Sequence, residues 1–286
     1  MFNSSDFIMA SSAHPLVSVC IPAFRGAAHI AAAIESVLAQ SLTDFELIII
    51  DDHSADNTVA IAQGFTDARI RILKNAENVG PQGNWNRCLH EARGKYFKLL
   101  PQDDLLAPDC LKKQLAILEQ DQAEAIALVF CARTIIDAHD KPVMARGYFQ
   151  EATGIVKASR LMRHCLRRGT NLIGEPGSVL FRRKLASATG DFDARIAYVL
   201  DLDYWFRLLQ QGDAYYLAEN LCSFRVSRGQ WSVAIGARQS TDYRRFIHKI
   251  AGNPDFPARR IDVWSGNLMA ELNNCLRLLF YRFFLN

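Results

Sequence analysis

Two adjacent carboxylates, Asp103 and Asp104, follow an apolar run with the length of a buried strand, residues 94–100. Adjacent acids repel each other, and placing them at the end of a core strand is costly unless a cation or hydrogen-bond donors compensate. Oxygen ligands at a strand end suit Mg²⁺ or Mn²⁺, which commonly bridge a protein carboxylate to substrate phosphates. The alternative is a turn that caps a helix predicted over 108–120, since Asp favours such positions. The residues alone leave both interpretations open.

A second pair of acids, Asp201 and Asp203, stands among large apolar residues at the start of a helix predicted to end near Gly212. Burial raises the pKa of a carboxylate toward that of a useful general base, so either acid is a candidate for that role. The alternative is structural, with Asp201 as the N-cap and Asp203 on the first helical turn.

The elements that must position these acids alternate between strand and helix. Apolar runs at 16–22, 45–50 and 69–73 predict strands, and helical periodicity lies between them. This alternation predicts an α/β fold, a mostly parallel sheet flanked by helices, whose ligands bind beyond the carboxyl ends of the strands. The residues that follow these strand ends, and that we expect to share one crevice, are Pro22, Ala23, Phe24, Asp51, Asp52, Asp103 and Asp104.

The first strand-to-helix turn, residues 23–28, excludes two kinds of nucleotide site. It lacks the GxGxxG spacing of a dinucleotide-binding fold, and it is not a Walker P-loop. Without a glycine cradle, the charge of a bound phosphate must be met in another way. A metal ion on Asp103 and Asp104 is the obvious candidate.

Composition sets further bounds on the 286 residues. The formal charge of +3 is too small and too dispersed to favour a nucleic-acid partner. Seven cysteines without a CxxC pair indicate a reducing compartment. Residues 1–14 lack the apolar core of a signal peptide, and no run approaches the ~20 apolar residues of a membrane span. We therefore expect a cytoplasmic protein.

A long helix is predicted over 261–284, after Pro254 and Pro257. Its apolar residues, flanked by arginines, could lie on the inner face of a membrane, cover a partner or, as is commonest for such a face, pack on their own domain. These residues are Leu276, Leu278, Leu279, Phe280, Phe283 and Phe284.

Together, these motifs resemble the family 2 inverting glycosyltransferases of GT-A fold. The resemblance runs in the expected order from about residue 16 to 232. The segments that carry it are 17–24, 51–58, 78–80, 84–86, 102–104, 200–203 and 224–228. It implies a Rossmann-like mostly parallel sheet with a C-terminal helical appendage. The implied division is an N-terminal tail (1–15), a nucleotide-sugar-binding half (16–132), an acceptor-binding half of the same domain (133–240) and a helical extension (241–286).

For the nucleotide, the resemblance implies that Pro22 and Phe24 border the base and that Asp52 accepts a hydrogen bond from a uracil-like imide. Ala23 and Asn84 are expected to belong to the same nucleotide-binding group. UDP is therefore the expected nucleotide of the donor.

For the reaction, the resemblance implies that Asp103 holds the ribose, Asp104 the metal on the diphosphate, and Asp201 deprotonates the acceptor hydroxyl. An in-line displacement needs one base and a stabilised leaving group, which agrees with this assignment. The expected activity is metal-dependent sugar transfer, with Mn²⁺ or Mg²⁺, to a saccharide or lipid-linked acceptor in surface polysaccharide synthesis. The alternative is a non-catalytic nucleotide-sugar or glycan-binding module of the same fold.

Three positions depart from the family pattern. Pro101 stands where many relatives have a further acid, Arg25 replaces the usual Asn, and Ser227 occupies the position of a frequent His. The last departure affects leaving-group stabilisation most directly. Arginines that can substitute for the His by direct pairing with phosphate are Arg225, Arg228 and Arg238.

Overall fold

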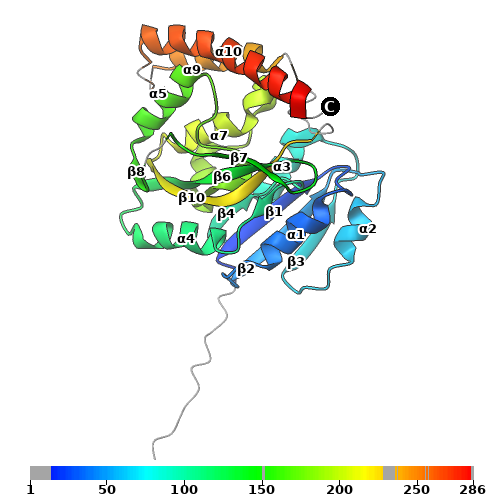
Figure 1. The fold of residues 1–286 in the computed structure, drawn as a ribbon. Helices are drawn as coiled ribbons and strands as arrows, with labels where there is room; N and C mark the ends of the chain where they lie inside the picture. Colours follow the sequence, from blue (N-terminus) through cyan, green and yellow to red (C-terminus); the bar gives the residue numbers. More distant parts are fainter. Residues whose placement is uncertain are drawn as a thin grey trace, which may run out of the picture.

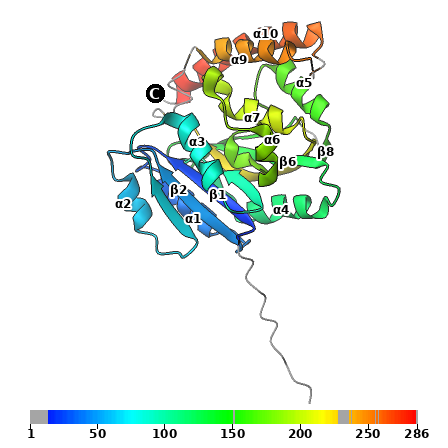
Figure 2. The same ribbon diagram turned by 180° about the vertical axis from the view of Figure 1, so that it is seen from behind.

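The computed structural model describes residues 14–149, 152–227, 236, 238–254, 256 and 258–284. Within these residues, one sheet of ten strands has helices on both faces (Figures 1 and 2). The first elements are β1 (Val17–Ala23), α1 (Ile30–Leu38), β2 (Phe45–Asp51), α2 (Thr58–Gln63), β3 (Ile70–Lys74), α3 (Gly80–Glu91) and β4 (Tyr96–Leu99). They follow the predicted alternation of strand and helix.

The remaining elements widen the sheet and add a helical layer. They are β5 (Leu105–Leu106), α4 (Cys110–Gln120), β6 (Ile126–Ile136), β7 (Pro142–Arg146), β8 (Gly154–Val156), α5 (Ala158–Arg168), η1 (Pro176–Ser178), β9 (Val179–Arg182), η2 (Arg183–Leu185), α6 (Ala186–Thr189), η3 (Ala194–Val199), α7 (Leu200–Leu208), β10 (Asp213–Arg225), α9 (Arg238–Ala251) and α10 (Arg260–Phe284).

The sheet has the order β3-β2-β1-β4-β9-β6-β10-β5, with β7 on β6 and β8 on β10. Strands β3, β2, β1 and β4 are parallel, whereas β9 runs antiparallel to both β4 and β6. The expected α/β fold is confirmed; β6 and β10 also pair in parallel, whereas β5, β7 and β8 pair antiparallel with their neighbours. One sheet runs through both expected halves, so their boundary at residue 132 stays a prediction.

The sheet divides the core into two clusters. Along β1, Val19 and Ile21 pack with residues of α1 and α4, whereas Cys20 belongs to the cluster that contains α3, α5 and α7. Strand β2 is buried along its whole length, which explains its continuous apolar run, since both faces are covered. The carboxyl ends of these strands are thereby held rigidly.

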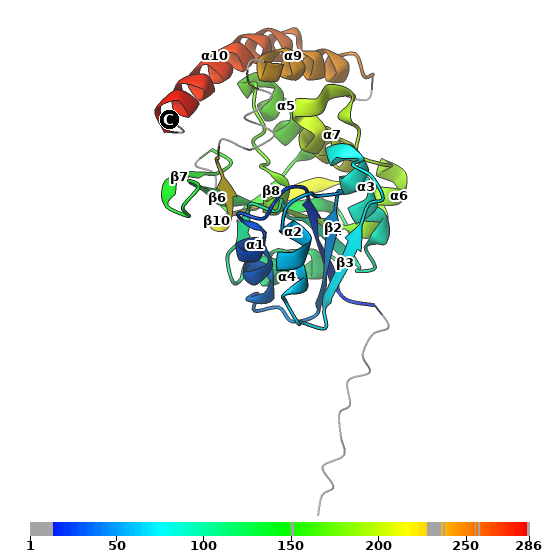
Figure 3. The same ribbon diagram turned by 90° about the vertical axis from the view of Figure 1, so that its right-hand side faces the viewer.

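The C-terminal helices form a layer at one end of the molecule. Figure 3 shows α9 and α10 side by side above α5 and α7, and contacts join α10 to both α5 and α9. No described helix is long and apolar enough to cross a membrane. The expected helical extension is therefore present, and part of it packs on its own domain.

Candidate active site

The carboxyl ends of the first strands meet, as the sequence predicted. The backbone N–H of Asp52 donates to the carbonyl of Ala23 at 2.7 Å, which joins the end of β2 to that of β1. The side-chain amide of Gln102 bonds to both the N–H and the carbonyl of Phe24, at 2.9 and 2.8 Å. Phe24 itself is 40% exposed, so its ring is available to a ligand at this edge. The ends of three strands thus meet at one edge of the sheet.

The acidic pair after β4 forms a turn. The N–H of Asp104 donates to the carbonyl of Pro101 at 3.1 Å. The proposed helix cap is wrong, because α4 begins only at Cys110 and Asp109 is its N-cap. A turn at Asp103 and Asp104 does not prevent these carboxylates from binding a metal ion, so that role stays a prediction.

Arg225 holds this turn from the end of β10. Its N–H donates to a carboxylate oxygen of Asp104 at 3.0 Å, and its Nε donates to the carbonyl of Asp103 at 2.8 Å. The guanidinium is fully buried and also donates to the carbonyl of Asp137 and the carboxylate of Asp140. The role of Arg225 in this structure is therefore to fix the acidic turn.

The structure describes only some of the other residues that are candidates for binding phosphate. Ser227 follows the end of β10, Arg238 begins α9, and Arg228 lies outside the described residues. Direct pairing of these arginines with phosphate stays a prediction.

The electrostatics of Asp104 favour a cation. Burial, followed by the charges of Asp103 and Glu175, raises the pKa of Asp104 well above 3.8, although the Arg225 N–H opposes the shift. The surroundings of Asp104 therefore offer too little positive charge to offset the negative charge of its ionised carboxylate. Oxygen donors of this kind fit Mg²⁺ or Mn²⁺, which use one or two carboxylates together with substrate phosphates. In the described part of the chain, no three His, Cys, Asp or Glu side chains form a metal-ligand group by themselves.

Asp52 is held in a network of hydrogen-bond donors. Its carboxylate accepts from the N–H groups of Val79 and Gly80, both at 2.9 Å, and from Nδ2 of Asn75 at 2.6 Å. The same Asn75 amide also donates to Asn84, whose own amide donates to a carbonyl of β2. Asn84 is buried, so in this structure it positions the Asp52 network. The base contacts of Asp52 and Asn84 stay predictions.

Asp201 lies on the first turn of α7. Its carboxylate accepts from the N–H of Leu202 at 2.7 Å and from Nδ2 of Asn171 at 2.9 Å. Burial, assisted by the charge of Glu175, raises the pKa of Asp201 from 3.8 to about 7, while these two hydrogen bonds lower it. The N-cap interpretation is wrong, because α7 begins at Leu200 and its N-cap is Val199.

Asp203 has a different environment two residues later. It is 3% exposed and accepts from Nζ of Lys249 at 2.5 Å and from Nε of Arg207 at 3.0 Å. These cations neutralise the carboxylate and connect α7 to α9. Of the two candidate bases, the geometry therefore favours Asp201.

Two residues of the site were not recognised from sequence. Glu175 pairs with Arg133, and its charge raises the pKa of both Asp104 and Asp201, so it acts on both acids. Asn171 orients Asp201 from the same loop, which precedes β9. The sequence predicts only a loop at 171–178, because the closeness of this segment to the acids depends on β9 running antiparallel to β4 and β6.

The sequence matches Glycosyl transferase family 2 over residues 18–205, and the chain belongs to this family. This confirms the glycosyltransferase class expected from the motifs. An uncharacterized protein of Mycobacterium tuberculosis is 29% identical over 263 residues, 89% of this chain and 82% of the relative. An uncharacterized glycosyltransferase of Rickettsia typhi is 31% identical over 76% of this chain, which spans 65% of that relative's length. A UDP-Glc:alpha-D-GlcNAc-diphosphoundecaprenol beta-1,3-glucosyltransferase of Escherichia coli is 35% identical over 36% of this chain and 41% of its own.

Solved structures agree on the fold. TarS of S. aureus in complex with UDP-GlcNAc has a TM-score of 0.68 at 16% identity, covering 92% of this chain and 73% of that one. The mannosyltransferase PcManGT of Pyrobaculum calidifontis, in complex with GDP-Man and Mn²⁺, has a TM-score of 0.64 at 17% identity, covering 94% and 75%. At these identities the likeness confirms the GT-A type fold, and the nucleotides and the metal belong to those proteins.

Proposed function

We propose that this chain is an inverting glycosyltransferase that moves a sugar from a nucleotide diphosphate, UDP being the expected nucleotide, to a hydroxyl group of a saccharide or lipid-linked acceptor. The observation that carries the proposal is the contrast between Asp201 and Asp203. Asp203 is neutralised by two cations, whereas Asp201 accepts from an amide and a backbone N–H and has a pKa of about 7. A base with this pKa is well matched to neutral pH.

In the proposed reaction, Asp201 takes the proton of the acceptor hydroxyl as its oxygen attacks the anomeric carbon. The bond from that carbon to the diphosphate breaks on the opposite face, which inverts the configuration. Asn171 orients the Asp201 carboxylate throughout. Burial, assisted by the neighbouring Glu175 charge, keeps the pKa of Asp201 at about 7, high enough for proton transfer.

Asp104 is the residue that would hold a divalent ion, Mn²⁺ or Mg²⁺, on the diphosphate, and Asp103 beside it is proposed to hold the ribose. Such an ion would offset the negative charge that develops on the leaving group. The chain contributes the fixed turn that presents these acids, held by Arg225. Phe24 and Asp52 are proposed to meet the base, with Pro22, Ala23, Asn84 and Asp103 completing the nucleotide side.

The proposed setting is surface polysaccharide synthesis in the cytoplasm, with peripheral attachment to the inner face of a membrane through α10. The name of the E. coli relative, which acts on a diphosphoundecaprenol-linked sugar, supports a lipid-linked acceptor. The structures of TarS and PcManGT hold UDP-GlcNAc and GDP-Man, respectively. A comparison of UDP- and GDP-sugars by thermal shift therefore comes before any kinetic assay, because a ligand that binds the native state raises its melting temperature.

The decisive experiment compares Asp201→Asn with Asp203→Asn, using the donor chosen by thermal shift. We expect Asp201→Asn to bind UDP within about a factor of two of wild type but to lose ~10² or more in turnover, as when a general base is removed. Asp203→Asn should retain most turnover per folded molecule. If Asp201→Asn stays active, the general-base assignment fails. If wild type binds the nucleotide sugar but transfers nothing to any acceptor tested, the non-catalytic binding module is favoured instead.

A further inference from the structure

Helix α10 carries a continuous apolar stripe that faces solvent. Its members recur at intervals of three or four residues, which places them on one side of a helix. They are Ile261, Trp264, Leu268, Leu272, Leu276 and Leu279, between 48% and 66% exposed. At 1.5 Å per residue, the stripe is about 27 Å long. Contiguous apolar surfaces of this size mark interaction sites.

The opposite side of α10 is already fixed against its own domain. Asp262, Gly266, Ala270 and Asn274 recur every four residues; Asp262, Ala270 and Asn274 are buried. A Cβ at Gly266 would lie 2.3 Å from the carbonyl oxygen of Leu166, so α5 and α10 touch closely there. The stripe is therefore held outward by close packing on the other face.

The sequence anticipated part of this surface. Of the apolar residues expected to form it, Leu276 and Leu279 lie on the stripe, while Leu278 points to another side of the helix. The side chains of Phe283 and Phe284 lie outside the described residues. The stripe extends much further toward the N-terminus of α10 than the sequence pattern suggested.

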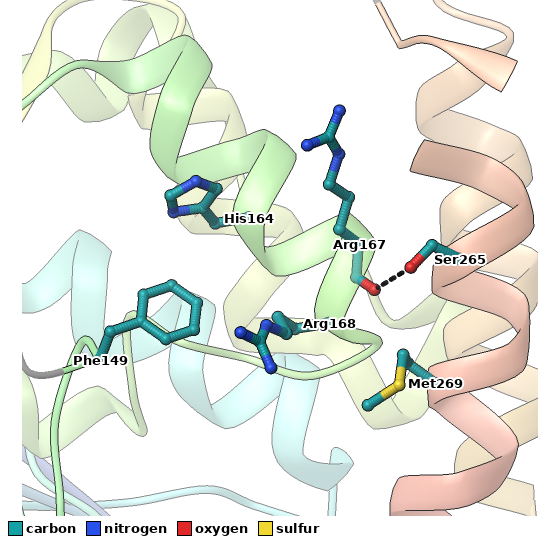
Figure 4. A pocket seen from close by; sticks show the side chains of 6 residues that line it. All are labelled: Phe149, His164, Arg167, Arg168, Ser265 and Met269. Carbon is teal, nitrogen blue, oxygen red and sulfur yellow. Dashed lines mark hydrogen bonds between the residues drawn. The ribbon is translucent and has the colours of Figure 1, made fainter. Parts of the chain in front are cut away.

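A cluster of arginines lies beside the stripe. Two adjoining cavities of about 450 and 200 Å³ share His164 and Arg167, and Figure 4 shows the residues that line the larger one. Among their described lining residues, five are arginine and none is acidic. This arginine cluster consists of Arg160, Arg163, Arg167, Arg168 and Arg259. The neighbouring buried carboxylate, Asp262, pairs with Arg163 and Arg167, whereas Arg168 and Arg259 are exposed.

The arginine cluster and the stripe form one surface. Ser265 and Met269 of α10 line the larger cavity, and Ser265 donates to the carbonyl of Arg167 at 3.1 Å. Leu268 and Leu272 follow these two residues by three positions, so they are their neighbours on the helix surface. An apolar ridge thus borders a cationic groove.

We infer that this surface docks on a bilayer containing anionic phospholipid, with α10 lying in the plane of the interface. The stripe would enter the boundary between headgroups and acyl chains, where Trp264 is well suited, and the arginine cluster would pair with lipid phosphates. The positive charge favours an anionic bilayer over a second copy of the chain, because a symmetric contact between two copies would bring two arginine clusters to one interface. The docking identifies the lipid chemistry and the residues of the proposed membrane attachment.

Docking would also orient the candidate active site. The guanidinium of Arg277 on α10 lies 5.2 Å from the ring centre of Tyr198, three residues before Asp201. The later turns of α10 therefore border the segment that leads to the base, and a docked α10 would hold the acceptor side of the site close to the lipid surface. The docking deepens the proposed membrane attachment, whereas this consequence for the acceptor rests also on the proposed transfer reaction.

The test uses the full chain, without donor or metal, and vesicles of phosphatidylcholine with or without phosphatidylglycerol. We expect binding to be at least about tenfold tighter with phosphatidylglycerol and to weaken as salt is raised. Tryptophan emission should shift to shorter wavelength with these vesicles, and Trp264→Phe should remove most of that shift. Because no reaction is measured, this result is independent of the proposed catalysis.

Variants locate the surface. Leu272→Glu should reduce vesicle binding by about tenfold or more, as burial of a charge in the interface is costly. Met144→Glu on β7 is the control, since Met144 is 49% exposed and Leu272 is 48% exposed. Arg168→Glu with Arg259→Glu should remove the preference for phosphatidylglycerol, whereas Lys113→Glu on α4, at the other end of the molecule in Figure 1, should not.

Melting temperatures equal to wild type establish that each variant is folded. If Leu272→Glu is not folded, Leu268→Glu is used in its place. Wild-type vesicle binding by the folded stripe variant would overturn the inference. So would an absence of vesicle binding combined with a dimer, seen by light scattering, that Leu272→Glu dissociates, because the occupant would then be a second copy.

Discussion

The side-chain amide of Gln102 forms two hydrogen bonds with the backbone of Phe24, accepting from its N–H at 2.9 Å and donating to its carbonyl at 2.8 Å. This pairing connects the turn after β1 to the acidic turn after β4. The two turns carry the groups proposed to meet the base and the diphosphate. Strands β1 and β4 are neighbours in the sheet, and the Gln102 side chain adds a direct link between the turns that follow them.

Gln102→Ala should weaken UDP binding by about tenfold, because two neutral hydrogen bonds contribute roughly 1 kcal/mol each and no longer hold the two turns together. Isothermal titration with UDP measures the effect. Gln122→Ala, in an exposed turn after α4, is the control and should bind like wild type. Unchanged affinity in Gln102→Ala would mean that the spacing of these turns is irrelevant to the nucleotide.

Asp104→Asn should abolish the part of UDP binding that depends on Mn²⁺, since carboxylate and diphosphate are proposed to share one ion. Calorimetry in Mn²⁺ and in EDTA compares the variant with wild type. Equal UDP affinity of wild type in both conditions would remove the metal assignment while leaving the fold untouched.

Although Asp104→Asn is expected to weaken UDP binding in Mn²⁺, it should stabilise the folded protein. The folded-state pKa of Asp104 is raised above 3.8, so its ionised form makes the folded state less stable as the pH rises above that value. In EDTA, Asp104→Asn should therefore melt at a higher temperature than wild type at about pH 8, with the difference vanishing below about pH 4. A lower melting temperature at the higher pH would contradict the raised pKa.

Much of the nucleotide side could be predicted from sequence. The strands that end at Ala23, Asp51 and Leu99 are mostly apolar, and the candidate residues Phe24, Asp52 and Gln102 come within three positions of these ends. Parallel strands bring such ends to one edge, so local pattern and topology were sufficient. The network around Asp52 was less accessible, because Asn84 resembles a ligand contact in sequence but is buried against Asn75.

The acceptor side could be predicted only in part. Sequence placed Asp201 and Asp203 together at a helix start but could not separate them, because Lys249, which neutralises Asp203, comes 46 residues later. Asn171 and Glu175 were missed for a similar reason. Their contacts exist because β9 inserts antiparallel between β4 and β6, which apolar periodicity does not specify.

The rate of transfer should depend on the ionisation of Asp201. Its folded-state pKa of about 7 predicts that kcat/KM of wild type rises with pH through about 7 and then levels, as the base loses its proton. Asn171→Ala removes a hydrogen bond that lowers the pKa of Asp201, so kcat/KM of this variant should rise at a higher pH than that of wild type. A pH profile from about pH 5 to 9 checks both expectations. An unchanged midpoint in Asn171→Ala, with a wild-type melting temperature, would contradict the positioning role of Asn171.

The two acids of α7 should differ in stability as well as in catalysis. Asp203→Asn leaves the cations of Arg207 and Lys249 without their buried carboxylate, so unfolding in urea should show a loss of about 2 kcal/mol, less than for a fully buried pair because Lys249 is partly exposed. Asp201→Asn should not lower the free energy of unfolding, since its folded state no longer carries a poorly solvated carboxylate. A double-mutant cycle with Lys249→Gln should give a coupling of about 1 kcal/mol to Asp203 and none to Asp201. Coupling of Lys249 to Asp201 instead would reverse the assignment, making Asp201 the structural acid and Asp203 the candidate base.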